Sequence, residues 1–154
     1  MKILLIRPWP FLLDVEKNTY NIQETGLAKA LTRLGHPTDI LFWTDGEERT
    51  VNIPIEGSEP VRVFYRRGIA ALKNAWFLHI DQLAQNYDIL QSAEYNQIFS
   101  WYLAGRYPKK TVIYHGPYYS AFNRNYNRMC AVFDVLFTGR YRKKNTPFLV
   151  KSNL

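Results

Sequence analysis

The first 43 residues constrain the fold most strongly, because two short apolar runs flank one amphipathic segment. Residues 3–6 are continuously apolar, residues 21–36 have helical periodicity, and residues 39–43 are again mostly apolar. Two strands joined by a helix are typical of a parallel βαβ unit, since parallel strands need a crossover connection. Sheets of this kind bind ligands at the carboxyl ends of their strands, so the loop over residues 7–20 marks an expected site.

The same alternation continues to the end of the chain. We expect further strands at residues 51–55, 61–65, 87–90, 110–114 and 148–151, and helices at residues 70–85, 95–104 and 120–137. Strands separated by helices predict an α/β fold with a Rossmann-like, doubly wound and mostly parallel sheet covered by helices on both faces. At 154 residues the chain has the size of one domain with a substantial core.

The first helix has recognisable start and stop signals. Asn21 is the expected N-cap, with Glu24 completing a capping box, and Gly35 is the expected left-handed terminator. The spacing predicts that one face packs on the core, formed by Leu27, Ala30, Leu31 and Leu34. Ser120 is the expected N-cap of the last helix.

Composition excludes several classes of protein. No apolar run approaches the roughly 20 residues that a transmembrane helix needs, and the opening residues lack the pattern of a signal peptide. Cys130 is the single cysteine, which excludes an internal disulfide bond and fits a reducing cytoplasm. We therefore expect a cytoplasmic protein, with a peripheral position at the inner membrane face as a further option.

Charge is concentrated in the last third of the chain. Residues 1–100 carry 10 basic and 12 acidic side chains, whereas residues 101–154 carry 10 basic ones and only Asp134. This polarity suggests an anionic partner, namely a membrane surface, a phosphorylated substrate or nucleic acid. An acidic neighbouring domain would explain it equally well. Around the predicted last helix, Arg140, Arg142, Lys143 and Lys144 are candidates for contact with an anionic membrane, and the structural alternative is a solvated helix end.

Five short segments resemble, in the correct order, the N-terminal domain of the retaining GT-B glycosyltransferases of family 4, also called group 1. Residues 27–36 read LAKALTRLGH and are similar to the family pattern LAxxLxxxGH. Pro8 follows the first strand, as in the family. Residues 87–91 resemble its D-I-I/V-H strand, residues 111–116 its vvtxHg turn, and residues 148–152 its vixxS strand.

The resemblance implies an acceptor-binding domain of an enzyme that transfers a sugar from a nucleotide-sugar donor to a hydroxyl or lipid-linked acceptor, with retention. It also implies that the family's C-terminal, donor-binding domain lies outside this chain, and that this domain alone is inactive. No cofactor and no metal are expected. The E-x7-E spacings at Glu16/Glu24 and Glu48/Glu56 are coincidental, because that signature belongs to the C-terminal domain.

The resemblance also implies site residues. His115 matches a family histidine that lines the cleft near the acceptor and the transferred sugar, and an imidazole there can orient a hydroxyl or phosphate oxygen. Asp14, Arg66 and Asn96 are further acceptor-binding candidates, since they follow predicted strands and suit hydroxyl or phosphate groups. A solvated loop acid, a solvated arginine and a helix-start asparagine are the structural alternatives.

Asn18 and Thr19 occupy the positions where family members usually carry two glycines beside the donor diphosphate. Their side chains can form hydrogen bonds, but close approach of the backbone to a phosphate is less easy than with glycine. His36 and His79 are expected to be structural.

Alternatives to a glycosyltransferase half remain open from the sequence. They are a stand-alone nucleotide- or phosphate-binding α/β module, a fragment of a GT-B-fold sugar epimerase, and a basic module that binds membranes or nucleic acid. No nucleic-acid motif is recognisable, so we do not expect that partner.

Overall fold

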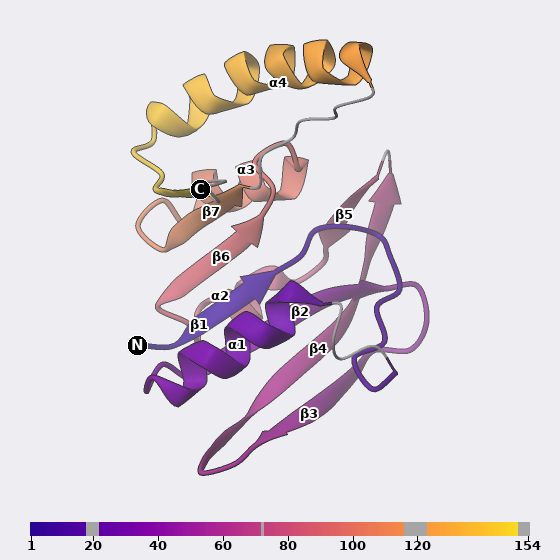
Figure 1. Cartoon of the computed structure of the whole chain (residues 1–154), viewed down its shortest axis with the longest axis vertical. Coiled ribbons are helices and arrows are strands. Elements are labelled where there is room, and N and C mark those ends of the chain that lie inside the picture. The colour runs from indigo at the N-terminus through magenta and orange to yellow at the C-terminus, as the bar shows by residue number, and fades with distance from the viewer. Residues whose placement is uncertain (18–21, 72, 116–122, 151–154) are drawn as a thin grey trace.

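The computed structural model describes residues 1–17, 22–71, 73–115 and 123–150. It is an α/β fold of the Rossmann-like type, as predicted, and Figure 1 shows one twisted sheet with helices on both faces. Its elements are β1 (Ile3–Ile6), α1 (Gln23–Arg33), β2 (Thr38–Thr44), β3 (Arg49–Ile55), β4 (Ser58–Ala71), β5 (Asn74–Phe77), α2 (Ile80–Ala84), β6 (Ile89–Ala93), α3 (Ile98–Arg106), β7 (Thr111–His115), α4 (Arg124–Arg142) and β8 (Phe148–Val150).

The sheet has the strand order β3-β4-β2-β1-β6-β7-β8, and β5 pairs with the far end of β4. Strands β4, β2, β1, β6, β7 and β8 are mutually parallel, while β3 and β5 run antiparallel to β4. β1 and residues 40–43 of β2 are apolar at every position because both faces of the sheet are covered there. Leu4 and Ile6 pack towards α2 and α3, whereas Ile3 and Leu5 pack on the α1 face.

The helix α1 buries a different face from the one predicted. Thr25, Ala28 and Thr32 are buried, while Leu34 is 74% exposed and Leu27 is also exposed. The threonine hydroxyls are satisfied locally, since Thr25 Oγ1 donates to the carbonyl of Ile22 at 2.7 Å and Thr32 Oγ1 accepts from the amide of Thr38 at 3.2 Å. Small, internally satisfied side chains therefore form the inner face, a choice that a ranking by hydrophobicity misses.

The two ends of α1 differ in how well the sequence predicted them. Ile22 is the N-cap residue and makes no side-chain capping bond, so the predicted capping box is wrong; Asn21 lies outside the described residues. Glu24 instead pairs with Arg7. Gly35 has φ of 84° and ends the helix in the left-handed conformation, as predicted.

Residues 70–85 do not form the predicted helix. β4 continues to Ala71 and returns as β5, and only residues 80–84 are helical. Gly68 explains the hairpin, because a Cβ atom there would lie 2.3 Å from the carbonyl oxygen of Trp76. The aromatic rings of Trp76 and Phe77 pack on Phe99 of α3. This tertiary packing overrides the helix propensity of the alanines and leucines.

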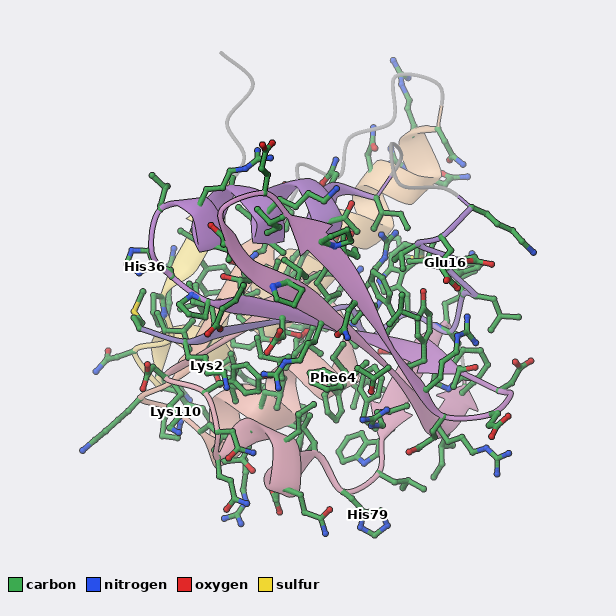
Figure 2. The ribbon with its side chains drawn as sticks, turned by 90° about the horizontal axis from the view of Figure 1, so that it is seen from below. Lys2, Glu16, His36, Phe64, His79 and Lys110 are labelled. Atoms are coloured by element: carbon green, nitrogen blue, oxygen red, sulfur yellow. The ribbon has the colours of Figure 1, made fainter. Side chains whose placement is uncertain are left out.

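A buried polar cluster at the amino edge of the sheet joins β2 to β4 and to the residues before β6. Asp39 is 4% exposed and accepts hydrogen bonds from Arg62 Nη2 and from the Tyr87 hydroxyl, each at 2.5 Å. Burial and the neighbouring Asp39 carboxylate raise the pKa of Tyr87 above its ordinary range. Figure 2 shows His36 and Lys110 at this end of the molecule, far from Glu16 in the loop after β1. The amino edge is therefore a structural region.

Candidate functional site

The strand order locates a crevice between β1 and β6. From β1 the chain passes through α1 to β2 on one side, while β6 and β7 lie on the other side of β1. In doubly wound sheets this reversal opens a crevice at the carboxyl ends of the two strands. A cavity of about 250 Å³ lies there, which we call the switch-point cleft. Its described lining residues are Arg7, Trp9, Gln23, Glu24, Ala93, Glu94 and Tyr114.

The switch-point cleft continues under α1. An adjoining cavity of about 220 Å³ shares Gln23, Glu24, Ala93 and Tyr114 with it. The remaining lining residues of this extension are mainly apolar, namely Leu5, Ile6, Leu27 and Gln91. The exposed side chain of Leu27 therefore lines this extension of the cleft.

An ion pair forms part of the wall of the cleft. Arg7 is the first residue after β1, and its Nη1 lies 3.1 Å from Oε2 of Glu24 in the first turn of α1. Both side chains are largely shielded, with 28% and 16% exposure. The helix N-terminus favours the Glu24 carboxylate. The pair therefore joins the loop after β1 to α1 and presents both signs of charge to the cleft.

Gln97 holds Trp9 in the wall of the cleft. Gln97 is 4% exposed, and in the amide orientation that satisfies its neighbours the side-chain oxygen accepts from Trp9 Nε1 at 2.9 Å. Its amide nitrogen donates to the Pro8 carbonyl at 2.9 Å and to Asn74 Oδ1 at 2.8 Å. Asn74 Oδ1 also accepts from the amide of Ile98 at 2.8 Å. The loop after β1 is thereby anchored to β5 and to the start of α3.

Glu94 lies directly after β6 in a left-handed backbone conformation, with φ of 71°. Its amide donates to the Tyr114 carbonyl at 2.8 Å, and its carbonyl accepts from the Gln97 amide at 3.3 Å. A non-glycine residue in this conformation is strained by roughly 1–3 kcal/mol and persists only where its surroundings hold it. Such strain concentrates at functional sites, which makes Glu94 a residue of interest.

The predicted site residues are dispersed. His115 ends β7 and pairs in register with Val150, next to the cleft residue Tyr114, but its side chain lies outside the described part. Asn96 lies between β6 and α3, and its buried Oδ1 has no hydrogen-bond partner among the described residues. Asn18 and Thr19 lie outside the described residues.

Asp14 lies in a separate cavity of about 300 Å³, together with Asp45, Arg49 and Tyr65. Its carboxylate accepts from the Glu16 amide at 3.0 Å and lies 3.6 Å from Lys17 Nζ. The Glu16 amide, with the charge of Lys17 adding to it, holds the pKa of Asp14 below its usual value. These are the contacts of a loop acid that organises its own turn.

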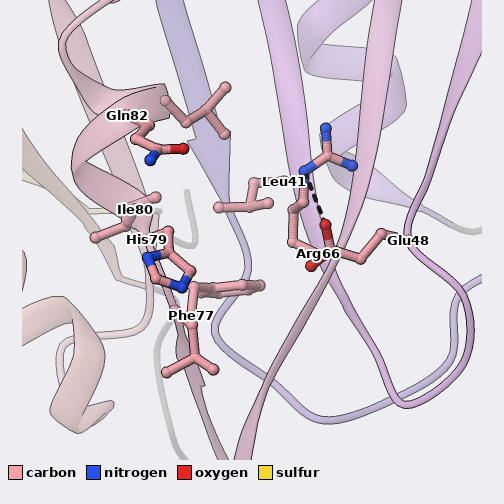
Figure 3. Close-up of a pocket in the computed structure, with 9 residues that line it drawn as sticks. Leu41, Glu48, Arg66, Phe77, His79, Ile80 and Gln82 are labelled. Carbon is pink, nitrogen blue, oxygen red and sulfur yellow. Dashed lines mark ion pairs between the residues drawn. The ribbon is translucent and has the colours of Figure 1, made fainter.

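Arg66 lines a cavity of about 270 Å³ on the α2 face, which we call the α2 pocket. Figure 3 shows Arg66 beside Glu48, with Nε to Oε2 at 3.8 Å, opposite His79 and Gln82. The sequence placed Arg66 at the end of its strand, whereas β4 runs on to Ala71. Arg66 still lies near the carboxyl edge of the sheet, as predicted, because it pairs with Trp43, one residue before β2 ends. The structure does not bring Asp14 and Arg66 into the switch-point cleft.

The sequence analysis did not predict four of the residues that line the cleft, namely Arg7, Trp9, Glu24 and Glu94. The signal for two of them was present, since Arg7 and Glu94 are the first residues after β1 and β6. A consistent reading of strand ends would have selected both. Glu24 was assigned to capping instead, and nothing in the sequence indicates that Gln97 fixes Trp9.

A search finds no protein-family model and no curated protein that matches this chain. α4 is too polar to span a bilayer, and none of the other helices in the described ranges has the length and apolarity that a span requires. Within those same ranges, no three His, Cys, Asp or Glu side chains gather as a metal site would require.

Proposed function

We propose that this chain is the acceptor-binding half of a retaining GT-B glycosyltransferase, with the acceptor held in the switch-point cleft. The whole enzyme would transfer a sugar from a nucleotide-sugar donor to a hydroxyl of a free or lipid-linked acceptor. The donor would be held mainly by a second α/β domain. Two things support the proposal: the five sequence resemblances in the correct order, and a Rossmann-like sheet with a polar cleft at its switch point.

The chemistry of the cleft carries the proposal. Glu24 and Glu94 supply carboxylates that accept hydrogen bonds, and Arg7 supplies a guanidinium that donates them. Sugar hydroxyls both donate and accept, so they match this mixture. The indole of Trp9 offers a flat apolar surface on which the C–H face of a sugar ring can pack.

The balance of charge favours an acceptor over a nucleotide. The described lining residues include two carboxyl side chains and one guanidinium, so acidic groups outnumber basic ones in the cleft. A diphosphate in the same place would meet like charge from both carboxylates. A neutral polyhydroxylated molecule meets no such repulsion. A stand-alone nucleotide-binding module would require the opposite balance.

The proposal assigns a role to each element of the cleft. Arg7 and Glu24 hold the loop after β1 against α1 through their ion pair, and Gln97 keeps Trp9 in position. Glu94 offers its carboxylate from a backbone conformation that the Tyr114 carbonyl helps to hold. His115, next to Tyr114 at the end of β7, would act on the acceptor hydroxyl. Asp14 and Arg66 have no part in acceptor binding.

Calorimetric titration of the chain tests the proposal. The ligands are glucose, mannose, galactose, N-acetylglucosamine and their disaccharides, with UDP-glucose as the donor probe. We expect saturable binding of at least one sugar, weakened about tenfold or more by Glu94→Gln because a charge-assisted hydrogen bond is lost. The matched control, Glu48→Gln in the α2 pocket, should change the affinity less than about twofold.

Two results of this titration would contradict the proposal. One is tight binding of UDP-glucose combined with no binding of any sugar, which would indicate a nucleotide module. The other is sugar binding that Glu94→Gln leaves unchanged, which would place the sugar outside the cleft.

A further inference from the structure

α4 exposes an apolar stripe to solvent. Its members are 52–76% exposed, and we call them the α4 outer stripe: Met129, Val132, Val135 and Leu136. They are spaced three and four residues apart, so they lie on neighbouring positions of one side of the helix. Four exposed apolar side chains on one helical side are more than scattered surface residues explain.

The stripe is separate from the side that attaches α4 to the domain. Tyr141 is fully buried, its hydroxyl donates to the Tyr95 carbonyl at 2.9 Å, and its ring packs edge-on against Phe148. Figure 1 shows α4 lying across one end of the molecule, along the edge formed by β7 and α3. The outer stripe therefore remains uncovered although the helix is docked.

Basic side chains surround the stripe. Arg124 and Arg128 lie at the amino end of α4, and Arg140, Arg142, Lys143 and Lys144 lie at its carboxyl end, all of them exposed. Asp134 is the single acidic residue in the whole segment from 101 to 154. A helix with apolar residues on one side and a large excess of basic over acidic residues matches the composition of interfacial membrane helices.

An aromatic groove on α3 extends this surface. It is lined by Trp76, Ile98, Trp101, Tyr102, Arg106 and Lys144. The guanidinium of Arg140 lies 4.3 Å from the centre of the Trp101 ring, which joins the groove to α4. Leu136 precedes Arg140 by four residues, so this end of the outer stripe neighbours Arg140 on the helix surface. Tryptophan and tyrosine beside arginine and lysine are typical of the membrane interface.

We propose that α4 docks flat on an anionic lipid bilayer, with the outer stripe in the interface and the basic residues against the lipid headgroups. A second copy of the chain does not fit the same surface, because two helices with this excess of positive charge would repel each other. This proposal rests on α4 and α3 alone and holds whatever ligand the switch-point cleft binds.

Vesicle co-sedimentation of the full chain tests the proposal. Vesicles of phosphatidylcholine alone are compared with vesicles that also contain about one third phosphatidylglycerol. We expect binding to the anionic vesicles at least about tenfold stronger than to the neutral ones. Changing Arg140, Arg142, Lys143 and Lys144 together to Ser should reduce the binding by about tenfold or more, since each basic residue contributes favourably at an anionic surface.

The apolar part is tested separately. Val132→Gln with Leu136→Gln removes apolar surface without adding charge and should weaken binding to the anionic vesicles about fivefold or more. Leu34→Gln with Leu78→Gln changes two equally exposed apolar residues elsewhere and should leave it within about twofold. Circular dichroism confirms that each variant keeps its helices.

Three results would overturn the proposal. The first is a parent chain that does not bind the anionic vesicles. The second is undiminished binding by the Val132→Gln, Leu136→Gln variant. It would show that electrostatic attraction alone holds the chain on the vesicles, without insertion of the outer stripe. The third is salt-sensitive binding to single-stranded RNA that the fourfold Ser variant abolishes, together with no vesicle binding.

Discussion

The switch-point cleft and the α2 pocket share a similar volume and an arginine–glutamate pair, and they differ in position. Each has a volume near 250–270 Å³, and each contains an arginine paired with a glutamate. In the cleft the pair lies at the carboxyl ends of β1 and β6, where strand direction and loop position converge on a ligand. In the α2 pocket the pair joins β4, beside the end of β2, to the exposed residue before β3, and it lies away from the switch point. Position relative to the sheet, more than residue content, therefore separates a candidate site from a surface hollow.

Removing the aromatic side chain of Trp9 from the cleft should give the largest difference between the two cavities. We expect Trp9→Ala to weaken sugar binding about tenfold or more, because the ring contributes most of the apolar contact area. His79→Ala, in the wall of the α2 pocket, should leave the affinity within about twofold. The measurement is calorimetric titration with the sugar that binds best. Equal losses from both variants would remove the distinction between the two hollows.

The support beneath the cleft gives the next largest effect. Gln97→Leu removes the hydrogen bonds that Gln97 makes to the Trp9 indole N–H and to the Pro8 carbonyl, so we expect the free energy of unfolding to fall by about 1–3 kcal/mol. The exposed Gln82→Leu in the α2 pocket should change stability by less than about 0.5 kcal/mol. Urea unfolding followed by tryptophan fluorescence compares the two. A Gln97→Leu variant as stable as the parent would show that the anchor of the loop lies elsewhere.

The two ion pairs should differ in strength. Arg7 and Glu24 are better shielded and closer than Arg66 and Glu48, so Glu24→Gln should destabilise the chain by about 0.5–1 kcal/mol. The better-exposed Glu48→Gln should have an effect near zero. Thermal unfolding at low and high salt provides the measurement. Similar shifts for the two variants would mean that burial at the cleft adds nothing to the pair.

The smallest effect concerns the helix that walls the α2 pocket. The Tyr107 hydroxyl donates to Asp81, and together with Arg106 it lowers the pKa of Asp81 below 3.8. A lowered pKa in the folded state contributes stability that is present above the unfolded value and is lost as the pH falls through the folded one. Asp81→Asn should therefore lower the melting temperature slightly at pH 7.

The pH dependence of that variant is its control. The difference in melting temperature between Asp81→Asn and the parent should shrink below about pH 4 and vanish once Asp81 is protonated in both states. A difference that is constant from pH 7 to pH 2 would mean that the carboxylate charge has no part in the effect.

The fold was predictable where one local pattern decides the structure. Continuous apolar runs predicted the central strands, because both faces of a parallel sheet are buried, and Gly35 ended α1 as expected. Prediction failed where distant contacts decide. The segment 70–85 became a hairpin because Gly68 admits the backbone of Trp76, and no periodicity in that segment carries this information.

The candidate site was predictable in place but only partly in content. The carboxyl-edge rule located it in the loop after the first strand, and Arg7 and Glu94 follow from the same rule once the strand ends are known. Arg66 lies near the predicted edge, beside the end of β2, but β4 is two strands away from β1 and so from the switch point. The strain at Glu94 and the hydrogen bonds of Gln97 depend on how three segments meet, so the sequence alone does not contain them.

Mapping of backbone and indole chemical-shift changes by nuclear magnetic resonance, with the best-binding sugar as ligand, tests the central claim most directly. The account predicts that the largest changes fall on the amides of Arg7, Glu24 and Glu94 and on the indole N–H of Trp9. The amide resonances of residues that line the α2 pocket should not shift. Largest changes at Arg66, His79 and Gln82, with an unperturbed Trp9 indole, would contradict it.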